Sequence, residues 1–329
     1  MEIVMSKISS RLTARRAALA LLLVVASLVF IVCEKNSPTE VDNSSGDVQL
    51  AAPPAGQGLQ IVISPFEVPV GKEIQRNYYL KLPSDVDIYV KKVEMVYNTG
   101  SHHVNVFKTD SISVPDHFEE TFSAVQWESW DMVFASQREE LHWQLPPRVA
   151  IPLKAHQQLD VQVHYVNANT QQTSNGRGKV IINLWTMPKD SVQSYVGALF
   201  ANNRLLNIPP HSDTTYMKIV RPLPWDIKIL MLTGHFHSRG RSFIVKRLLT
   251  DEEVYRNEEW DEPPIVFYNP PLELQAFDRL AYWTRFVNTT NYTITFGPHV
   301  EYEEHANLFM FFYPGPPDGK AIYDFEVFE

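Results

Sequence analysis

The sequence predicts an all-β protein that consists of two tandem antiparallel β-sandwich (jelly-roll) domains. Apolar residues recur with a period of two in short runs, and turn-forming residues separate these runs, as in Pro83-Ser84-Asp85. No GxGxxG motif, P-loop or coiled-coil heptad is present. Many short strands with regularly spaced turn signals are typical of sandwiches and jelly rolls.

The alternating runs form two series, and a weak helical pattern occurs only at residues 134–143. In the first series we expect strands at residues 59–63, 77–82, 87–97, 104–107, 159–166 and 179–185. In the second series we expect strands at residues 195–200, 217–220, 227–237, 242–246, 281–287, 292–295, 307–313 and 322–328. A break near residues 187–191 separates the two series, so we predict one sandwich at 59–188 and another at 189–329.

Composition and charge limit the class of protein. The 329 residues are 44% hydrophobic and 20% charged, a globular balance that excludes a disordered or collagen-like chain. The formal net charge is −9. Because an acidic protein does not bind nucleic acid by neutralising phosphates, a nucleic-acid partner is excluded.

The first 33 residues have the pattern of an export signal. A basic stretch from Lys7 to Arg16 precedes an uncharged apolar run at 17–32, which is short for a membrane span. Cys33, the only cysteine, follows directly, and the polar segment 34–58 predicts a flexible tether. We therefore expect an extracytoplasmic protein, secreted or attached to a membrane, with no intramolecular disulfide.

A single cysteine directly after a signal core resembles a bacterial lipoprotein. In such proteins the thiol of the cysteine, here Cys33, is lipidated and anchors the chain to the membrane at the periplasmic or cell surface. Phe30, Ile31 and Val32 depart from the lipobox, in which small residues precede the cysteine. The alternative is an uncleaved signal anchor with an incidental cysteine.

Five of the 11 histidines fall in three close settings, of which two lie in the first half. His102 and His103 open an expected strand, where neighbours point to opposite faces. Both reach one metal only if a strand end or a bulge lies there. In the expected strand 159–166, alternation places His164 on the same face as Gln162, and the apolar residues on the other face.

The third setting is His235 and His237, which are separated by one residue in an expected strand. Both imidazoles would lie on one face, roughly 6–7 Å apart at Cα, and neutral imidazole binds copper, zinc or iron. Each setting alone also fits hydrogen-bonded or exposed histidines. The histidines expected to be structural or exposed are His117, His142, His156, His211 and His299.

The order of these motifs resembles the copper type II, ascorbate-dependent monooxygenases, the group of peptidylglycine α-hydroxylating monooxygenase and dopamine β-monooxygenase. The resemblance covers most of residues 90–313. It rests on Ser101-His102-His103, Gln162-Val163-His164-Tyr165, His235-Phe236-His237-Ser238-Arg239-Gly240 and Glu304-His305-Ala306-Asn307. The family's paired jelly rolls agree with the two sandwiches predicted above from the strand pattern.

The resemblance implies two mononuclear copper sites that face each other across an interdomain cleft. His102, His103 and His164 would hold the electron-transfer copper, and His235 and His237 would hold the copper that binds O2. Ascorbate or another reductant would reduce both coppers, and a C–H bond of a small organic substrate would become C–OH. We expect the protein to act as a monomer.

The second site departs from the family pattern. The family's third ligand is a methionine in a Glu-Met-x-Asn setting, and His305 stands at that position here. Met310 lies five residues on, so alternation turns it to the opposite strand face. If His305 binds, the all-imidazole site favours Cu(II) relative to a thioether site, and zinc binding or electron transfer becomes an alternative to O2 activation. Otherwise His305 is an exposed strand residue.

The substrate positions differ as well. Thr233 and Phe309 stand where peptidylglycine enzymes carry an arginine and a tyrosine that hold the substrate carboxylate. Neither side chain pairs with an anion, so a C-terminal glycine peptide is not the expected substrate. Asn307 alone remains as a candidate substrate-binding residue.

Three interpretations follow from the sequence. The first is a secreted or lipid-anchored copper monooxygenase that acts on a small organic molecule with O2. The second is a copper-binding or electron-transfer protein of the same fold without hydroxylase activity, which the change to His305 favours. The third is a β-sandwich adhesion or ligand-binding lipoprotein with fortuitous histidines.

Overall fold

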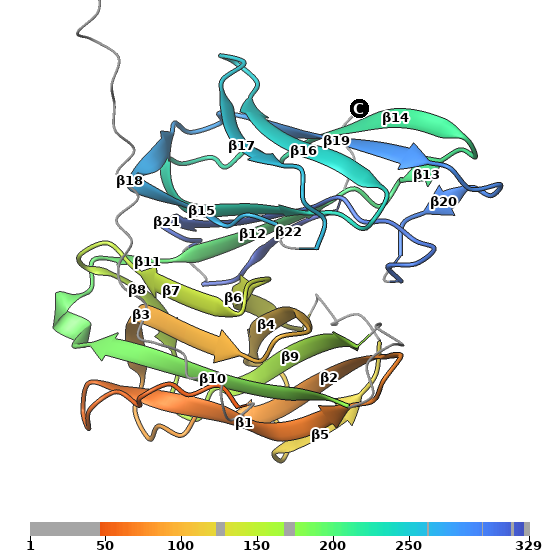
Figure 1. The fold of residues 1–329 in the computed structure, drawn as a ribbon. Coiled ribbons are helices and arrows are strands. Elements are labelled where there is room, and N and C mark those ends of the chain that lie inside the picture. The colour runs from red at the N-terminus through yellow and green to blue at the C-terminus, as the bar shows by residue number, and fades with distance from the viewer. Residues whose placement is uncertain are drawn as a thin grey trace, which may run out of the picture. The chain divides into compact units, whose positions relative to one another are not determined.

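The computed structural model describes residues 47–122, 129–167, 175–261, 263–297, 299–316 and 319–325 (Figure 1). Within these ranges the chain is all-β apart from one 3-10 helix at Lys189–Ser191, which confirms the predicted all-β class. No helical segment among them has the length and hydropathy that a membrane span requires. The predicted signal sequence and Cys33 lie outside the described residues.

Residues 58–195 form two sheets, which occupy the lower half of Figure 1. The first sheet contains, in order, β1 (Gly58–Val68), β10 (Gly176–Met187), β3 (Ile88–Tyr97), β8 (Val149–Leu153) and β11 (Ser194–Tyr195), with β7 (Glu140–Gln144) also on β3. The second contains β5 (His117–Glu120), β2 (Lys72–Lys81), β9 (Gln158–Asn167), β4 (Ser101–Thr109) and β6 (Asp131–Ser136). Strand β11 lies beyond the predicted domain boundary at residue 188.

Both of these sheets contribute side chains to one hydrophobic core. In β9, Val161, Val163 and Tyr165 are buried in this core, whereas Gln162 and His164 alternate with them on the other face of the strand. This alternation confirms the face assignment made from the sequence. It directs His164 away from the core, toward the side on which the rest of the chain packs.

The later strands form three further sheets, in the upper half of Figure 1. The largest contains β18 (Val266–Leu274), β15 (Ile227–His235), β21 (Asn307–Tyr313), β12 (Gly197–Asn202) and β22 (Ile322–Asp324). The next contains β14 (Ser212–Ile219), β19 (Leu280–Asn288), β16 (Gly240–Arg247) and β17 (Glu253–Asn257), and the smallest pairs β13 (Asn207–Ile208) with β20 (Ile294–Thr295). A second hydrophobic core unites the two larger sheets.

The sheet that contains β15 is apolar on both faces. Ile229 and Leu232 are buried in the second core, whereas Leu230, Met231 and Phe311 belong to the first core. The continuous apolar run in β15 is the pattern of a strand covered on both sides. The two cores therefore meet across this sheet, and its face lies against the strands of the first half.

Contacts between strands of the two halves fix this packing. The Trp143 ring on β7 meets the Phe311 ring on β21 edge to face, with centroids 5.2 Å apart. The Tyr323 hydroxyl on β22 donates to the Trp130 carbonyl at 2.6 Å and accepts from the Met132 amide at 3.0 Å. These contacts hold β7 against β21 and β6 against β22.

The structure differs from the predicted elements at several places. The segment 134–143, expected to be helical, contains the end of β6 and the start of β7, so that prediction is wrong. The Ser136 hydroxyl accepts from the Arg138 amide at 3.1 Å, a local turn that competes with a helix. Strands β5, β8, β13, β17 and β18 were not expected, and the short pairs β11–β8 and β12–β22 are parallel.

The described part of the predicted tether lies against the first sheet. Asn183 Nδ2 donates to the Ala51 carbonyl at 2.8 Å, and Lys179 Nζ donates to the Val48 carbonyl at 3.0 Å. Val48 is itself buried against Val96. Residues 47–57 thus differ from the flexible segment predicted for them, because side chains of β10 bind their backbone.

Candidate metal centres

The first group of histidines lies where β4 pairs with β9. Ser101 is opposite Tyr165 and His103 is opposite His164, so β4 has one extra residue, His102, at this point. An extra residue of this kind is a β-bulge, which turns its side chain out of the regular alternation. On a regular strand His102 and His103 would point to opposite faces. The bulge is the irregularity that allows both side chains to face one point.

The three imidazoles form a compact triad, which we call the first triad. Ring centroids are 5.5 Å apart for His102 and His103, 5.2 Å for His102 and His164, and 4.9 Å for His103 and His164. One nitrogen from each ring lies within 4.8 Å of the others. This spacing allows three imidazole nitrogens to bind a single metal ion.

Neighbouring polar groups set the tautomers of two of these rings. His164 Nε2 is 2.7 Å from Glu73 Oε1, and His103 Nε2 is 3.3 Å from Gln162 Oε1. Both oxygens accept, so each Nε2 carries the proton and each Nδ1 keeps a free electron pair. Metal-binding histidines in proteins have the same arrangement, because the second ring nitrogen donates to a carboxylate or carbonyl.

The remaining ring of the first triad is unpaired. Neither ring nitrogen of His102 has a hydrogen-bond partner among the residues that the structure describes, although both nitrogens are buried. An unpartnered buried polar group costs about 1–3 kcal/mol. Binding of a metal ion by one of the two ring nitrogens of His102 would remove the cost at that nitrogen.

The second triad is formed by His235, His237 and His305. His235 is the last residue of β15, and His237 and His305 lie in the segments between strands, before β16 and before β21. Ring centroids are 5.2 Å apart for His235 and His237, 5.8 Å for His235 and His305, and 4.4 Å for His237 and His305. Again one nitrogen of each ring lies within 4.8 Å of the others.

Two expectations about this triad need correction. The strand predicted at 227–237 ends at His235, so His237 does not share a regular strand face with it. The alternative that His305 is an exposed strand residue is wrong, because it precedes β21 and faces both other imidazoles. Met310 lies in the second core, in agreement with the expectation that it points away from His305.

Glu304 holds the segment that carries His237. Its buried carboxylate accepts from the His237 amide and from the Arg239 amide, each at 2.8 Å. Burial raises the pKa of Glu304 to about 7, and these two amides act in the opposite direction. The residue after Glu304 is His305. This short segment therefore contributes one imidazole of the triad, His305, and positions the backbone of another, His237.

Hydrogen bonds also orient the rings of the second triad. His237 Nδ1 donates to the Glu303 carbonyl at 3.0 Å, which leaves Nε2 with a free electron pair. The Gln137 amide group lies 2.9 Å from His235 Nδ1, and its Oε1 has no partner within the described chain. If this amide turns by half a rotation, Oε1 accepts the Nδ1 proton and His235 Nε2 becomes available to a metal.

All six imidazoles are neutral near pH 7. Burial lowers the pKa of every one of them, and neighbouring imidazoles lower it further for most. The pKa of His237 falls to about 4. Neutral imidazole is the form that binds metals, so no proton has to be removed.

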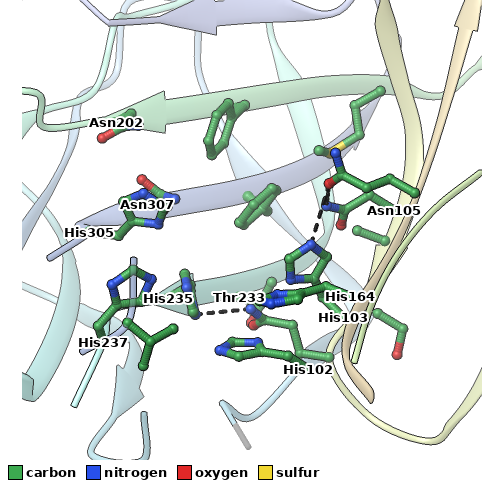
Figure 2. Close-up of a pocket in the computed structure, with 18 of the residues that line it drawn as sticks. His102, His103, Asn105, His164, Asn202, Thr233, His235, His237, His305 and Asn307 are labelled. Atoms are coloured by element: carbon green, nitrogen blue, oxygen red, sulfur yellow. Dashed lines mark hydrogen bonds between the residues drawn. The ribbon is translucent and has the colours of Figure 1, made fainter. Parts of the chain in front are cut away.

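Both triads border the same cavity of about 210 Å³ (Figure 2). Figure 2 shows the two groups of labelled histidines beside each other, with His235 and His102 between the remaining members. The rings of His102 and His235 have centroids 5.3 Å apart. The two triads therefore approach each other through these two rings.

The cavity also has a floor made by three adjacent strands. Asn202 on β12 is opposite Asn307 on β21, which is opposite His235 on β15. Two residues further along, Phe200 is opposite Phe309, and these rings stack with centroids 4.6 Å apart. In the described part of the chain, Oδ1 of Asn202 and Oδ1 of Asn307 are buried without a hydrogen-bond partner.

The structure brings together all seven residues predicted for the metal and substrate sites in the described chain, since Asn307 also borders the cavity. The other five histidines lie outside both triads. Four residues at these sites were not expected from the sequence, namely Glu73, Gln137, Asn202 and Arg204, of which Arg204 is an exposed residue at the same cavity. The polar run at 202–204 directly after an apolar strand is a signal that could have indicated two of them.

Comparisons with known proteins leave the family open. No protein-family model matches the sequence, and no curated protein matches it. Among solved structures, the STIV MCP has a TM-score of 0.35 and 8% identity, over 78% of this chain and 96% of that chain. The VP2 subviral particle of infectious bursal disease virus has a TM-score of 0.19 and 7% identity, over 84% and 77%. TM-scores this low indicate neither a shared fold nor a shared function.

The depressed pKa values predict that the metal-free protein is sensitive to acid. In the unfolded chain the six imidazoles bind protons below about pH 6.5, whereas the folded protein keeps them neutral, down to about pH 4 for His237. The unfolded state therefore binds more protons, and the free energy of unfolding falls as pH falls from 6.5 toward 4. Burial raises the pKa of Glu304 to about 7 and that of Asp160 to about 8, so these two carboxyl groups oppose the trend set by the six imidazoles.

Urea denaturation of the chelator-treated protein at pH 7 and pH 5 measures this effect. We expect the free energy of unfolding to be lower at pH 5 by at least about 1.4 kcal/mol, the equivalent of one pKa unit. Equal stability at the two pH values would show that the imidazoles are not held neutral by the fold.

Proposed function

We propose that this protein is a copper-dependent monooxygenase of the copper type II, ascorbate-dependent kind, with one copper ion in each histidine triad. The observation that supports it best is the convergence on one cavity of six neutral imidazoles, three of them buried and three half-buried. We further propose that the four larger sheets form two tandem jelly-roll sandwiches, 59–188 and 189–329. Two cores, each shared by a pair of sheets, support that arrangement.

The donor atoms fit copper. Three imidazole nitrogens in a buried setting suit copper, zinc or iron rather than magnesium or calcium, which prefer oxygen ligands. Copper bound here would supply one-electron redox chemistry and a position for dioxygen. The protein's part is to hold the rings: Glu73 keeps the proton on His164 Nε2, and the Glu303 carbonyl keeps it on His237 Nδ1.

The proposed reaction inserts one oxygen atom of O2 into a C–H bond and releases the other as water. Ascorbate, or another two-electron reductant, supplies two electrons and two protons and is itself oxidised. The apolar side chains around the cavity, among them Phe200, Phe296 and Phe309, limit the access of bulk water to the reacting carbon.

The cavity favours a small organic substrate with an apolar body and a hydrogen-bond donor. The stacked rings of Phe200 and Phe309 provide an apolar surface, and the unpartnered Oδ1 atoms of Asn202 and Asn307 provide acceptors in the adjacent row. A substrate hydroxyl or amine that donates to either oxygen would satisfy a buried group and fix the orientation of the molecule.

A second function is favoured by one observation, the all-imidazole second triad. His305 takes the position of the family's methionine, and Met310 is buried in the second core, so no thioether of that segment replaces it. Imidazole ligands favour Cu(II) more than a thioether does. The alternative is therefore a copper-binding or electron-transfer protein of the same fold that does not hydroxylate a substrate.

We propose an extracytoplasmic location, with lipid attached at Cys33 as the membrane anchor and with a monomeric body. The location and the lipid anchor rest on the basic and apolar pattern of residues 1–33, which lie outside the described residues.

The function is tested by copper content and ascorbate-dependent oxygen uptake of the copper-loaded protein after unbound copper has been removed. We expect two coppers per chain and measurable uptake. His164→Ala should lower the content to one copper and abolish uptake while the circular dichroism spectrum is retained. His142→Ala is the matched control, because His142 is exposed and lies outside both triads. Uptake by His164→Ala equal to that of wild type would contradict the proposal.

The substrate class is tested by binding of benzyl alcohol and toluene to the metal-free protein, in which the alcohol has no metal to ligate. We expect the alcohol to bind about 2- to 10-fold more tightly, the value of one hydrogen bond. Asn202→Ala should reduce this preference, whereas Asn291→Ala, at an exposed site outside the cavity, should leave it unchanged. Calorimetry measures both affinities, and equal affinities in the wild type would rule out a donor-selective cavity.

A further inference from the structure

The cavity bordered by the two triads is positively charged, although the protein as a whole is acidic. Among the described residues that border it, Arg204 alone has a charged side chain, because none is an aspartate or a glutamate and the six imidazoles are neutral. The formal net charge of the whole chain is −9. A cavity whose charge differs in sign from that of the surrounding protein favours an anionic ligand.

The turn after β12 holds Arg204 at this cavity. The preceding residue, Asn203, is buried, and its backbone amide donates to the Ala306 carbonyl at 3.1 Å. The side-chain oxygen of Asn203 accepts from the Leu205 amide at 3.1 Å, and Leu206 is buried in the second core. The backbone on both sides of Arg204 is therefore fixed, whereas its own side chain is exposed and accessible to a ligand.

An aromatic ring positions the guanidinium group. The guanidinium carbon of Arg204 lies 3.9 Å from the centroid of the Phe325 ring. Phe325 meets Phe200 edge to face, with centroids 5.6 Å apart, and Phe200 stacks on Phe309 in the floor of the cavity. A guanidinium that lies over a ring keeps the N–H groups at its edge available for hydrogen bonds. One ring thus joins the charge to the apolar floor.

These N–H groups have no acceptor from the described part of the chain, within which Arg204 forms no ion pair and no side-chain hydrogen bond. Other exposed arginines do have carboxylate partners. Arg256 pairs with Glu253 at 2.7 Å, and Arg285 pairs with Asp213 at 2.6 Å. An arginine binds a carboxylate through two parallel N–H···O bonds, so Arg204 has this capacity left for a ligand.

We propose that the cavity binds an organic acid whose carboxylate pairs with Arg204. The same molecule carries a hydrogen-bond donor for Oδ1 of Asn202 or Asn307, which have no partner in the described chain, and an apolar body that packs on Phe200 and Phe309. This inference names the substrate class of the proposed function. It rests on that function only in calling the ligand a substrate, because binding itself requires no metal.

Mandelate tests the carboxylate, because it is benzyl alcohol with a carboxylate added to the carbon that carries the hydroxyl. Calorimetry on the metal-free protein at low salt measures both affinities without a metal that either compound could ligate. We expect mandelate to bind at least about 5-fold more tightly, since charge-assisted hydrogen bonds are stronger than neutral ones. Equal affinities, or tighter binding of benzyl alcohol, would overturn the proposal.

Arg204→Gln removes the charge and keeps a polar side chain. We expect the preference for mandelate to disappear in this variant while benzyl alcohol binds as in the wild type, which shows that the cavity is intact. Arg256→Gln is the matched control, because Arg256 is exposed, lies outside the cavity and carries the same charge. It should keep the preference.

Three results with the variants would contradict the assignment to Arg204. The preference for mandelate could persist in Arg204→Gln, or Arg256→Gln could remove it to the same extent; in either case Arg204 does not bind the carboxylate. Loss of benzyl alcohol binding from Arg204→Gln would give Arg204 a structural role instead.

The copper experiments separate this inference from the proposed function. If mandelate binds through Arg204 but the copper-loaded protein takes up no oxygen, the acid site stands and the monooxygenase proposal fails. If oxygen uptake occurs but mandelate has no advantage over benzyl alcohol, the monooxygenase proposal stands and the acid site fails.

Discussion

The candidate site depends on one packing constraint: the sheet formed by β18, β15, β21, β12 and β22 buries both of its faces. One face forms the second core, and the other contributes Leu230, Met231 and Phe311 to the first. Burial of an apolar side chain of this size stabilises a fold by about 1.5–3 kcal/mol. Because this contact fixes the end of β15 against the bulge of β4, two histidine groups far apart in the sequence border one cavity.

Several polar groups at the cavity have no hydrogen-bond partner from the described part of the protein. His102 and the side-chain oxygens of Gln137, Asn202 and Asn307 are buried without hydrogen-bond partners in the described chain, and each unpaired group costs folding energy. In contrast, His164, His103 and His237 do have hydrogen-bond partners, and these partners fix the rings in tautomers that leave one nitrogen free.

Local patterns predicted much of this structure, and long-range packing accounts for what they missed. Alternation placed His164 and Gln162 on the same strand face, and the His102-His103 pair required an irregularity that the bulge supplies. The helical pattern at 134–143 was wrong, because a turn at Ser136 interrupts it. The contact of Gln137 with His235 joins residues 98 positions apart, and the periodicity of a local sequence pattern cannot predict such a contact. The common cavity of the two triads depends on the same packing, and the family resemblance, not any local pattern, implied it.

The central claim is that each triad binds one metal ion. Anomalous diffraction from copper-loaded crystals, measured on both sides of the copper absorption edge, tests it most directly. The account predicts two copper peaks per chain, one among His102, His103 and His164 and one among His235, His237 and His305. Peaks only at exposed histidines such as His142 or His156, or no peak at either triad, would contradict it.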